Sequence, residues 1–275
     1  MIERISESCP PIRFQLNRLK RDLGDERQAF HETIDRHLAD YCRFHDLDTD
    51  SVCERYLEFV GRYASDLKHF ERTGQFPYQR EHSSDYSPDR QTYDLFLIIS
   101  ALVTPHRFAL MEGVATCRSG GRALIMGAGP GLELLLLESR FSKLDAADLS
   151  VSPFLRERFP NVRFFNEFPP DKEVYDTVFA IELIEHLSDP YGFLAELRDR
   201  MTVCGCAAIT TVNNVPQFDH VNNFSDPLDF ERNVCSLGLR LDRKWHVPHE
   251  YLFSNVDANN TFYLLTRSPG ERPPD

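Results

Sequence analysis

The sequence predicts an α/β protein in which a doubly wound, mostly parallel sheet follows an N-terminal helical region. From about residue 12 to 118, apolar residues recur at helical spacing and turn signals are sparse. After Gly121, short apolar runs alternate with helical segments, the order typical of a parallel sheet covered by helices. The last two apolar runs are joined by a loop alone, which indicates an antiparallel pair at the sheet edge. We therefore expect two regions, 1–118 and 119–275.

Two apolar stripes mark helices in the first region. Ile34, Leu38 and Tyr41 lie at helical spacing and predict one helix. A second stripe contains six residues at three- and four-residue intervals: Cys53, Tyr56, Leu57, Val60, Tyr63 and Leu67. Residues 73–90 hold a glycine, two prolines and several serines, so we expect a loop there.

Two further helices complete the first region. A hydrophobic helix is expected from about Thr92. Thr104 and Pro105 then have the residue types of an N-cap and a first-turn proline, and predict a helix through Met111.

The second region is expected to begin with strands of a parallel sheet. Five buried strands are predicted: Ala123–Met126, Leu144–Ala147, Val162–Phe165, Thr177–Ile181 and Cys206–Val212. One helix is expected from Leu132, and another opens at Ser188–Asp189–Pro190. Leu239–Val247 and Thr261–Thr266 form the expected antiparallel pair.

Charge and cysteine content restrict the partners and the compartment. Lys and Arg number 31 and Asp and Glu 43 in 275 residues, a formal charge of -12 that repels phosphate backbones, so we expect no nucleic-acid partner. The seven cysteines include no C-x-x-C pair, as expected of free thiols in a reducing compartment. No signal peptide or membrane-spanning apolar run is found, so a cytoplasmic protein without a membrane partner is expected.

A glycine-rich turn follows the first predicted strand. Gly127, Gly129 and Gly131 stand between a strand and a helix, where glycine lets the backbone turn sharply beside a ligand. The spacing differs from the dinucleotide fingerprint, which requires glycine where this chain has Leu132. Asp148 follows 21 positions after Gly127, at the end of the second strand, where an acidic residue binds ribose hydroxyls. A tight turn without a ligand, and a helix N-cap for Asp148, are the structural alternatives.

These segments together resemble the class I S-adenosylmethionine-dependent methyltransferases. The matching stretches are MGAGPGLE, LDAADLS, YDTVFAIELIEHLSDP and RMTVCGCAAITTVN. The resemblance covers about residues 120–267 and implies a Rossmann-like seven-stranded sheet with the cofactor across the carboxyl ends of its first strands. The family usually has an acidic residue two positions before the first glycine, where this chain has Ile125. Glu133 or an N-terminal residue is the expected substitute.

The resemblance also assigns residues to the cofactor. Gly127, Gly129 and Gly131 would pass its methionine and ribose part, and Asp148 would accept from both ribose hydroxyls. It places Asn166 or Glu167 near the adenine amine. Ile181 and Glu182, after the fourth strand, would line the methyl-transfer face.

Two carboxylates and an imidazole follow the fourth strand. Glu182, Glu185 and His186 would share one face if the chain turns helical there, a plausible ligand set for Mg²⁺, Mn²⁺, Fe²⁺ or Zn²⁺. Asp219–His220 could add a further ligand. The arrangement resembles the metal-assisted O-methyltransferases, in which the ion lowers the pKa of the acceptor hydroxyl. Without a metal, His186 or His220 is the expected general base.

Other polar residues are weaker candidates. The helical region is expected to cover the cleft as a lid, or to serve only for packing or as a homodimer interface. Tyr93 and Arg107 are its candidate contacts, with helix-surface positions as the alternative. His246 and His249 could line the acceptor pocket or lie on the surface. The loop asparagines that could contact substrate are Asn213, Asn214, Asn222 and Asn223.

Three functions remain in competition. The first is O-methylation of a small molecule, whose identity the sequence does not give. The second is N-methylation of a small amine or a protein group, which the acidic surface would also suit. The third is a non-catalytic partner subunit with a methyltransferase fold, supported only by the apolar residue at position 125.

Overall fold

The computed structural model describes residues 1–21, 23–76, 89–170, 173–249 and 254–268. Its centre is a seven-stranded sheet in the order β3-β2-β1-β4-β5-β7-β6. The first five strands run parallel, and β7 pairs antiparallel with both β5 and β6. The strands are β1 Arg122–Met126, β2 Lys143–Ala147, β3 Arg163–Phe165, β4 Tyr175–Ala180, β5 Met201–Asn213, β6 Leu239–Pro248 and β7 Asn259–Arg267. The predicted fold class and edge pair are confirmed.

Each strand alternates its side chains between two helical layers. In β1, Leu124 packs with α9 (Pro190–Asp199) and α10 (Pro227–Ser236). Its neighbour Ile125 packs on the opposite face, in the cluster that includes α6 (Pro105–Ala115), α7 (Leu132–Leu137) and α8 (Pro153–Arg158). Both side chains are at most 1% exposed. Period-two burial on both faces explains why the strands read as continuous apolar runs.

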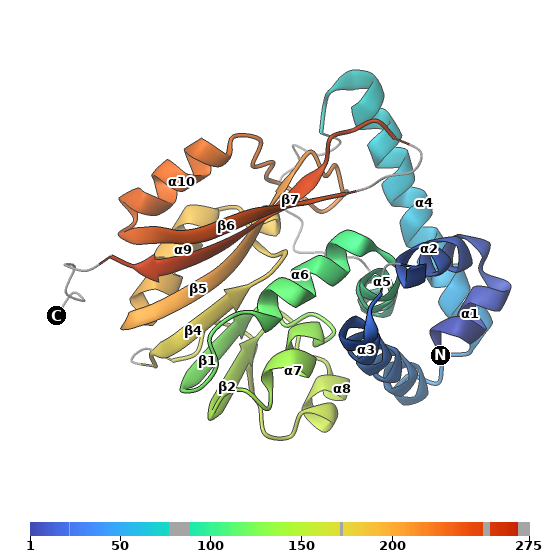
Figure 1. Ribbon diagram of the computed structural model, residues 1–275, viewed down its shortest axis with the longest axis horizontal. Helices are drawn as coiled ribbons and strands as arrows, with labels where there is room; N and C mark the ends of the chain where they lie inside the picture. Colours follow the sequence, from blue (N-terminus) through green and yellow to red (C-terminus); the bar gives the residue numbers. More distant parts are fainter. Residues whose placement is uncertain (22, 77–88, 171–172, 250–253, 269–275) are drawn as a thin grey trace.

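The N-terminal helices gather at one end of the sheet (Figure 1). They are α1 Ile2–Ser8, α2 Pro10–Arg21, α3 Asp25–Phe44, α4 Thr49–Thr73 and α5 Arg90–Val103, followed by α6. The predicted helices are confirmed. Residues 77–88 of the expected loop lie outside the described residues.

Some local details differ from expectation. Thr104 precedes α6, and Pro105 begins it, as predicted, but the Thr104 hydroxyl donates to the Ser100 carbonyl (2.6 Å) instead of capping the helix. The fourth strand ends at Ala180, one residue early. Helices α1, α8 and α10 were not predicted, although Ser152 and Asp226 cap the last two in front of a proline.

The N-terminal helices share one hydrophobic core with the sheet. Buried side chains from α1 to α6, from one sheet face and from α7 and α8 form a continuous cluster. Ile34 of α3 and Leu95 of α5 belong to it together with Leu134 of α7, and all three are fully buried. The division into regions 1–118 and 119–275 stays a prediction, and the core crosses it.

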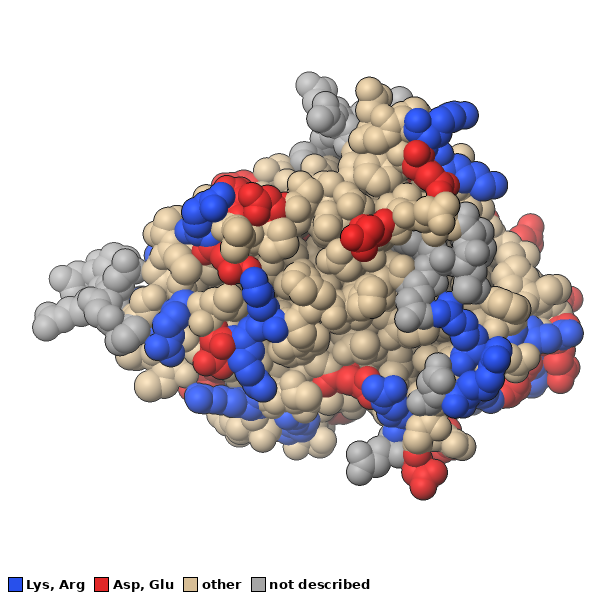
Figure 2. Space-filling model, turned by 45° about the horizontal axis from the view of Figure 1, so that its top comes forward, with Lys and Arg blue, Asp and Glu red and all other residues tan. Residues whose placement is uncertain are grey.

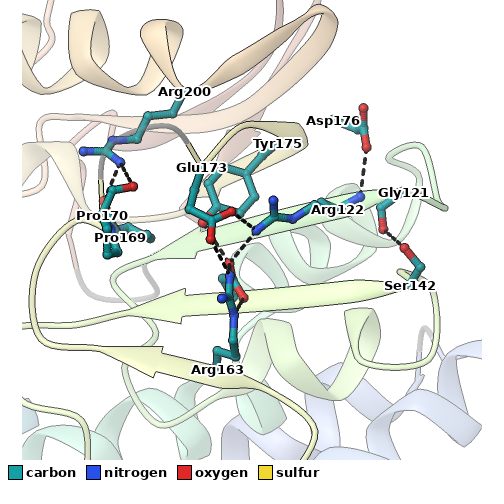
Figure 3. A network of polar contacts seen from close by, with 11 residues as sticks. Gly121, Arg122, Ser142, Arg163, Pro169, Pro170, Glu173, Tyr175, Asp176 and Arg200 are labelled. Atoms are coloured by element: carbon teal, nitrogen blue, oxygen red, sulfur yellow. Dashed lines mark hydrogen bonds and ion pairs between the residues drawn. The ribbon is translucent and has the colours of Figure 1, made fainter.

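A buried carboxylate ties the amino ends of four strands together. Asp145 in β2 is 1% exposed and accepts from Arg163 Nε (2.8 Å) and Tyr175 Oη (2.8 Å). Arg122 and Arg163 also pair with Glu173 (Figure 3). Burial alone would raise the pKa of Asp145, but hydrogen bonds from Arg163 and Tyr175 and the nearby charges bring it below its usual value. This network stabilises the end of the sheet away from the glycine turn.

The surface carries mixed charge. On the face shown in Figure 2, blue basic and red acidic side chains intermix around a tan centre. Among the described residues, no single helix is long and apolar enough to cross a membrane; α5 and α6 pass that test only as a pair, bent by 87°.

Candidate functional site

The glycine turn requires glycine at three positions. Gly127, Gly129 and Gly131 have φ values of 75°, 50° and 89°, in the left-handed region that side chains disfavour. A Cβ on Gly131 would also lie 2.6 Å from Leu155 Cδ2. His37 of α3 contacts this turn, because its Nε2 donates to the Pro130 carbonyl (2.8 Å).

Asp148 lies beside this turn at the carboxyl end of β2. Its Oδ2 accepts from the Gly129 amide (2.9 Å), and its Oδ1 accepts from the Ser150 amide (3.1 Å). Asp148 does not cap the following helix, because Ser152 does so. The carboxylate therefore faces the glycine turn, as the cofactor interpretation requires.

Arg90 of α5 binds this carboxylate. The sequence did not predict this contact. Arg90 Nη1 donates to Asp148 Oδ1 (3.1 Å) and its Nε to Asp94 Oδ1 (2.8 Å). Asp94 is 1% exposed and also accepts from Tyr41 Oη (3.2 Å). Burial raises the pKa of Asp94 to about 6, although Arg90 and Tyr41 oppose the shift. The spacing of Arg90 and Asp94, four residues apart at the start of a predicted helix, could have indicated their ion pair. It could not indicate the contact with Asp148, which lies 58 residues away in the sequence.

The predicted adenine contacts follow β3. Asn166 and Glu167 are both exposed, and Asn166 Nδ2 donates to the carbonyl of Leu149 (3.2 Å), the residue next to Asp148. The Leu149 side chain is 76% exposed. Their role toward a cofactor stays a prediction.

Glu182 does not share a helix face with Glu185 and His186. Its φ of 49° lies in the left-handed region, so no α-helix continues through Glu182. Only a 3₁₀ turn, Ile184–His186, follows. The Glu182 amide donates to Thr210 Oγ1 (2.6 Å), and its carboxylate pairs with Arg107 (2.5 Å) and accepts from Asn260 Nδ2 (3.0 Å). The expectation of one helical face was wrong, because the strained backbone at Glu182 turns its carboxylate toward α6 and β7. The neighbouring Ile181 is 7% exposed.

Three of the predicted ligands do come together. One ligand atom each from Glu185, His186 and His220 lies within 4.8 Å of the others, and all three residues are buried. Both carboxylate oxygens of Glu185 are buried without a hydrogen-bond partner. Burial raises the pKa of Glu185 to about 7 and lowers the pKa of His220 to about 4. We name these three residues the buried triad.

Backbone carbonyls orient both imidazoles of the buried triad. His186 Nδ1 lies 3.0 Å from the Asp219 carbonyl oxygen, and His220 Nδ1 lies 2.9 Å from that of Val215. A carbonyl only accepts, so each Nδ1 donates to it, and in neutral His220 the lone pair lies on Nε2. The Asp219 carboxylate, proposed as a further ligand, lies 3.6 Å from the same His186 nitrogen.

The loop after β5 is fixed to the buried triad by asparagine. The amides of Val221 and Asn222 both donate to the Glu185 carbonyl (2.9 and 3.0 Å), and Asn222 Nδ2 donates to the Leu187 carbonyl (2.6 Å). The Asn223 side chain accepts from the Asn214 amide (2.8 Å). Asn213 lies in the last position of β5. Asn222 and Asn223 therefore bind backbone groups, and a substrate role for any of the four asparagines stays a prediction.

A cavity of about 130 Å³ opens between the buried triad and the N-terminal helices. Tyr93 and Arg107, the two candidates from the helical region, both line it, as does His249, which stacks on His106 with ring centroids 3.8 Å apart. His246 instead bonds Thr261 Oγ1 (2.9 Å) across the β6–β7 pair. Every residue that lines the cavity is buried or half-buried.

Solved structures of known proteins share this fold. The mitomycin 7-O-methyltransferase MmcR has 13% sequence identity and a TM-score of 0.54, over 79% of this chain and 71% of MmcR. The N-methyltransferase NodS from Bradyrhizobium japonicum, in complex with S-adenosyl-L-homocysteine, has 10% identity and a TM-score of 0.50, over 76% of this chain and 100% of NodS. No protein-family model matches the chain, and no curated protein matches its sequence. At such identities the likeness establishes the fold.

Proposed function

We propose that the chain is an S-adenosylmethionine-dependent methyltransferase that methylates an oxygen of a small-molecule acceptor. The observation that carries the proposal is Asp148, a carboxylate bonded to the amide of a three-glycine turn at the carboxyl edge of the sheet. Ligands of doubly wound sheets bind at this edge. The shared fold with MmcR and NodS supports the same cofactor.

The chain offers suitable groups for the nucleoside part of this cofactor. The two oxygens of Asp148 suit the paired hydroxyls of a ribose. Asn166 and Glu167 are exposed beside it, and Leu149 adds an exposed apolar surface for a purine ring. The cofactor supplies the methyl group on a positively charged sulfur.

Glu133 is our candidate for the ammonium at the methionine end. Ile125, at the position where the family usually has an acidic residue, is 1% exposed and apolar. Glu133 is buried in the first turn of α7, directly after the glycine turn, and no hydrogen bond or ion pair joins its carboxyl to another described residue. Burial raises its pKa to about 7, so a bound ammonium would stabilise its charged form.

The buried triad is our candidate for activating the acceptor hydroxyl. Two imidazoles with Nε2 lone pairs and a carboxylate without partners match what a divalent cation needs, so Glu185, His186 and His220 would hold one. Such an ion would lower the pKa of a bound hydroxyl. Glu182, paired with Arg107, joins this set only if that ion pair opens. Without a metal, Glu185 is a better proton acceptor near pH 7 than His220, whose pKa is about 4.

N-methylation of a cationic amine is the second candidate. Two carboxylates, those of Glu182 and Glu185, border the cavity and would attract an ammonium group. The likeness to the N-methyltransferase NodS is compatible with this acceptor. A non-catalytic subunit is the third, and it predicts no cofactor binding.

Titration calorimetry with S-adenosylmethionine tests the cofactor assignment. We expect binding by the wild type and a loss of at least tenfold in affinity for Asp148→Ala, since a charged hydrogen bond contributes about 1.5–3 kcal/mol. Asp242→Ala, an exposed carboxylate on β6, is the control and should bind as the wild type. Absence of binding by the folded wild type would favour the non-catalytic subunit.

Chelation tests the metal. Activity should fall after treatment with a chelator and return with Mg²⁺, Mn²⁺, Fe²⁺ or Zn²⁺, and direct titration should detect one bound ion. Glu185→Gln should abolish that binding. Full activity in the chelator would reject the metal and leave the carboxylate base.

A further inference from the structure

The cavity beside the buried triad is small. The N-terminal helices line most of it, with side chains from α2, α4, α5 and α6, and the loops after β4, β5 and β6 line the rest. All of its lining residues are buried or half-buried, so an acceptor group on a protein or nucleic acid would have to reach between the helices to enter it.

The size of the cavity limits the acceptor to about one ring. Its volume is about 130 Å³. An engineered apolar cavity of about 150 Å³ holds a benzene molecule, whereas pockets for drug-sized ligands span about 300–1,000 Å³. A second fused ring would therefore require the walls to move.

The wall of the cavity formed by the N-terminal helices is aromatic and firmly packed. Tyr56, Tyr93 and Phe96 line it. Phe96 stacks on Phe59 with ring centroids 3.8 Å apart, and Tyr56 is 2% exposed and stacks on Phe96 at 6.2 Å. Aromatic walls favour a planar aromatic ligand through stacked and edge contacts. Because these rings support one another, the wall resists expansion.

The polar groups of the buried triad line the same cavity as these aromatic rings. In a cavity with room for one ring, a reacting oxygen has to be attached directly to that ring to reach them. A hydroxyl on an aromatic ring also loses its proton near pH 10, far more readily than an aliphatic alcohol, and so needs less activation.

We propose that the acceptor is a single-ring phenol, held with its ring against Tyr56, Tyr93 and Phe96 and its hydroxyl at Glu185, His186 and His220. This inference rests on the proposed function. The phenol oxygen forms a bond to the methyl carbon while the sulfur–carbon bond breaks with its electron pair remaining on sulfur. The phenolic proton leaves through the buried triad to water.

The first experiment compares acceptors with radiolabelled S-adenosylmethionine and the wild-type full chain. The set is 4-methylphenol, 2-naphthol, cyclohexanol and 4-methylaniline. We expect methylation of 4-methylphenol, at least tenfold lower kcat/KM for 2-naphthol, and none for cyclohexanol or the aniline. Equal or faster turnover of 2-naphthol or cyclohexanol would overturn the proposal, as would methylation of the aniline alone.

The second experiment fills the cavity. Ala64 of α4 lines it, while the next residue, Ser65, is exposed. Ala64→Phe should raise the KM for 4-methylphenol at least tenfold without changing S-adenosylmethionine affinity, and Ser65→Phe should leave both unchanged. If the two variants have the same KM, the acceptor binds elsewhere. A wild type that binds the cofactor but neither binds nor methylates a phenol refutes this inference alone, whereas no cofactor binding refutes the proposed function.

Discussion

Backbone carbonyls fix the tautomer of three buried histidines in and near the site. His37, His186 and His220 each have one ring nitrogen 2.8–3.0 Å from a carbonyl oxygen. This contact fixes the tautomer, and burial keeps at least His37 and His220 neutral, with pKa values of about 4. The protonation of His37 and His220 is therefore set by their burial in the folded chain.

His37 should make the protein less stable in acid. Its pKa is about 4 when folded and about 6.5 when unfolded, so between these values the unfolded chain binds the extra proton and stability falls as the pH falls. His37→Gln keeps a donor for the Pro130 carbonyl but does not titrate. From pH 7 to pH 4.5, the wild type should lose about 2–3 kcal/mol more unfolding free energy than the variant.

Denaturant titrations at several pH values measure this difference. The other histidines are present in both proteins, so their contributions cancel. Two pH profiles that run parallel would show that His37 is already charged in the folded state or has no altered pKa.

Glu133 should affect the cofactor only through its amino-acid end. Glu133→Gln removes the carboxylate charge, and we expect about tenfold weaker binding of S-adenosylmethionine. Binding of 5′-methylthioadenosine, which lacks the ammonium, should not change. Glu138→Gln, just beyond the other end of α7, is the control, and calorimetry measures all three proteins. Equal weakening for both ligands would place Glu133 in a structural role.

At the scale of elements, α6 packs on the sheet through a glycine. A Cβ on Gly113 would lie 2.8 Å from Phe262 and 3.0 Å from Trp245, whose rings stack on each other at 4.4 Å. Gly113→Ala should therefore destabilise by about 1–3 kcal/mol despite the better helix propensity of alanine.

Gly61→Ala, in the exposed part of α4, is the matched variant. A Cβ there meets nothing within 4 Å, so the substitution should stabilise by about 0.5–1 kcal/mol. Chemical denaturation measures both values, and the fluorescence of Trp245 should change only for Gly113→Ala. If both substitutions stabilise the protein, the rings of Phe262 and Trp245 move aside without a loss of stability.

Helix α5 should compete with the cofactor through Arg90. The guanidinium bonds Asp148, the carboxylate assigned to the ribose, so cofactor hydroxyls have to replace it. We expect Arg90→Gln to tighten S-adenosylmethionine binding several-fold and to lower stability, because buried Asp94 loses its ion pair. Calorimetry and thermal unfolding measure the two effects. Weaker cofactor binding would show that Arg90 holds the cofactor instead.

At the scale of the whole molecule, one hydrophobic core contains side chains of the N-terminal helices α1 to α6 and of the sheet. Because buried residues of α1 to α6 pack in the same cluster as β1, α7 and α8, these N-terminal helices and the sheet should unfold together. Far-UV circular dichroism, dominated by the helices, and fluorescence of the single tryptophan, Trp245, should give the same midpoint. Two separate midpoints would identify regions 1–118 and 119–275 as independent units.

The sequence by itself determined the strands, most of the helices and the edge of the sheet at which the glycine turn lies. Hydrophobic periodicity depends on neighbouring residues, so strands such as Ala123–Met126 were predicted almost to the residue. The glycine turn and Asp148 were found because a fixed chain spacing separates them. Glu185, His186 and His220 were predicted as one ligand set from the resemblance to the metal-assisted O-methyltransferases, and the structure brings the three together.

Only the tertiary structure decided which residues the N-terminal helices contact. Arg90 reaches Asp148 across 58 residues, and Arg107 reaches Glu182 across 75, distances at which no local pattern carries information. The left-handed backbone at Glu182 likewise removed it from the buried triad, because packing against Arg107 and Asn260 outweighed the helical spacing. The cavity volume that limits the acceptor arises from contacts between helices distant in sequence, and these depend on how whole side chains fill space.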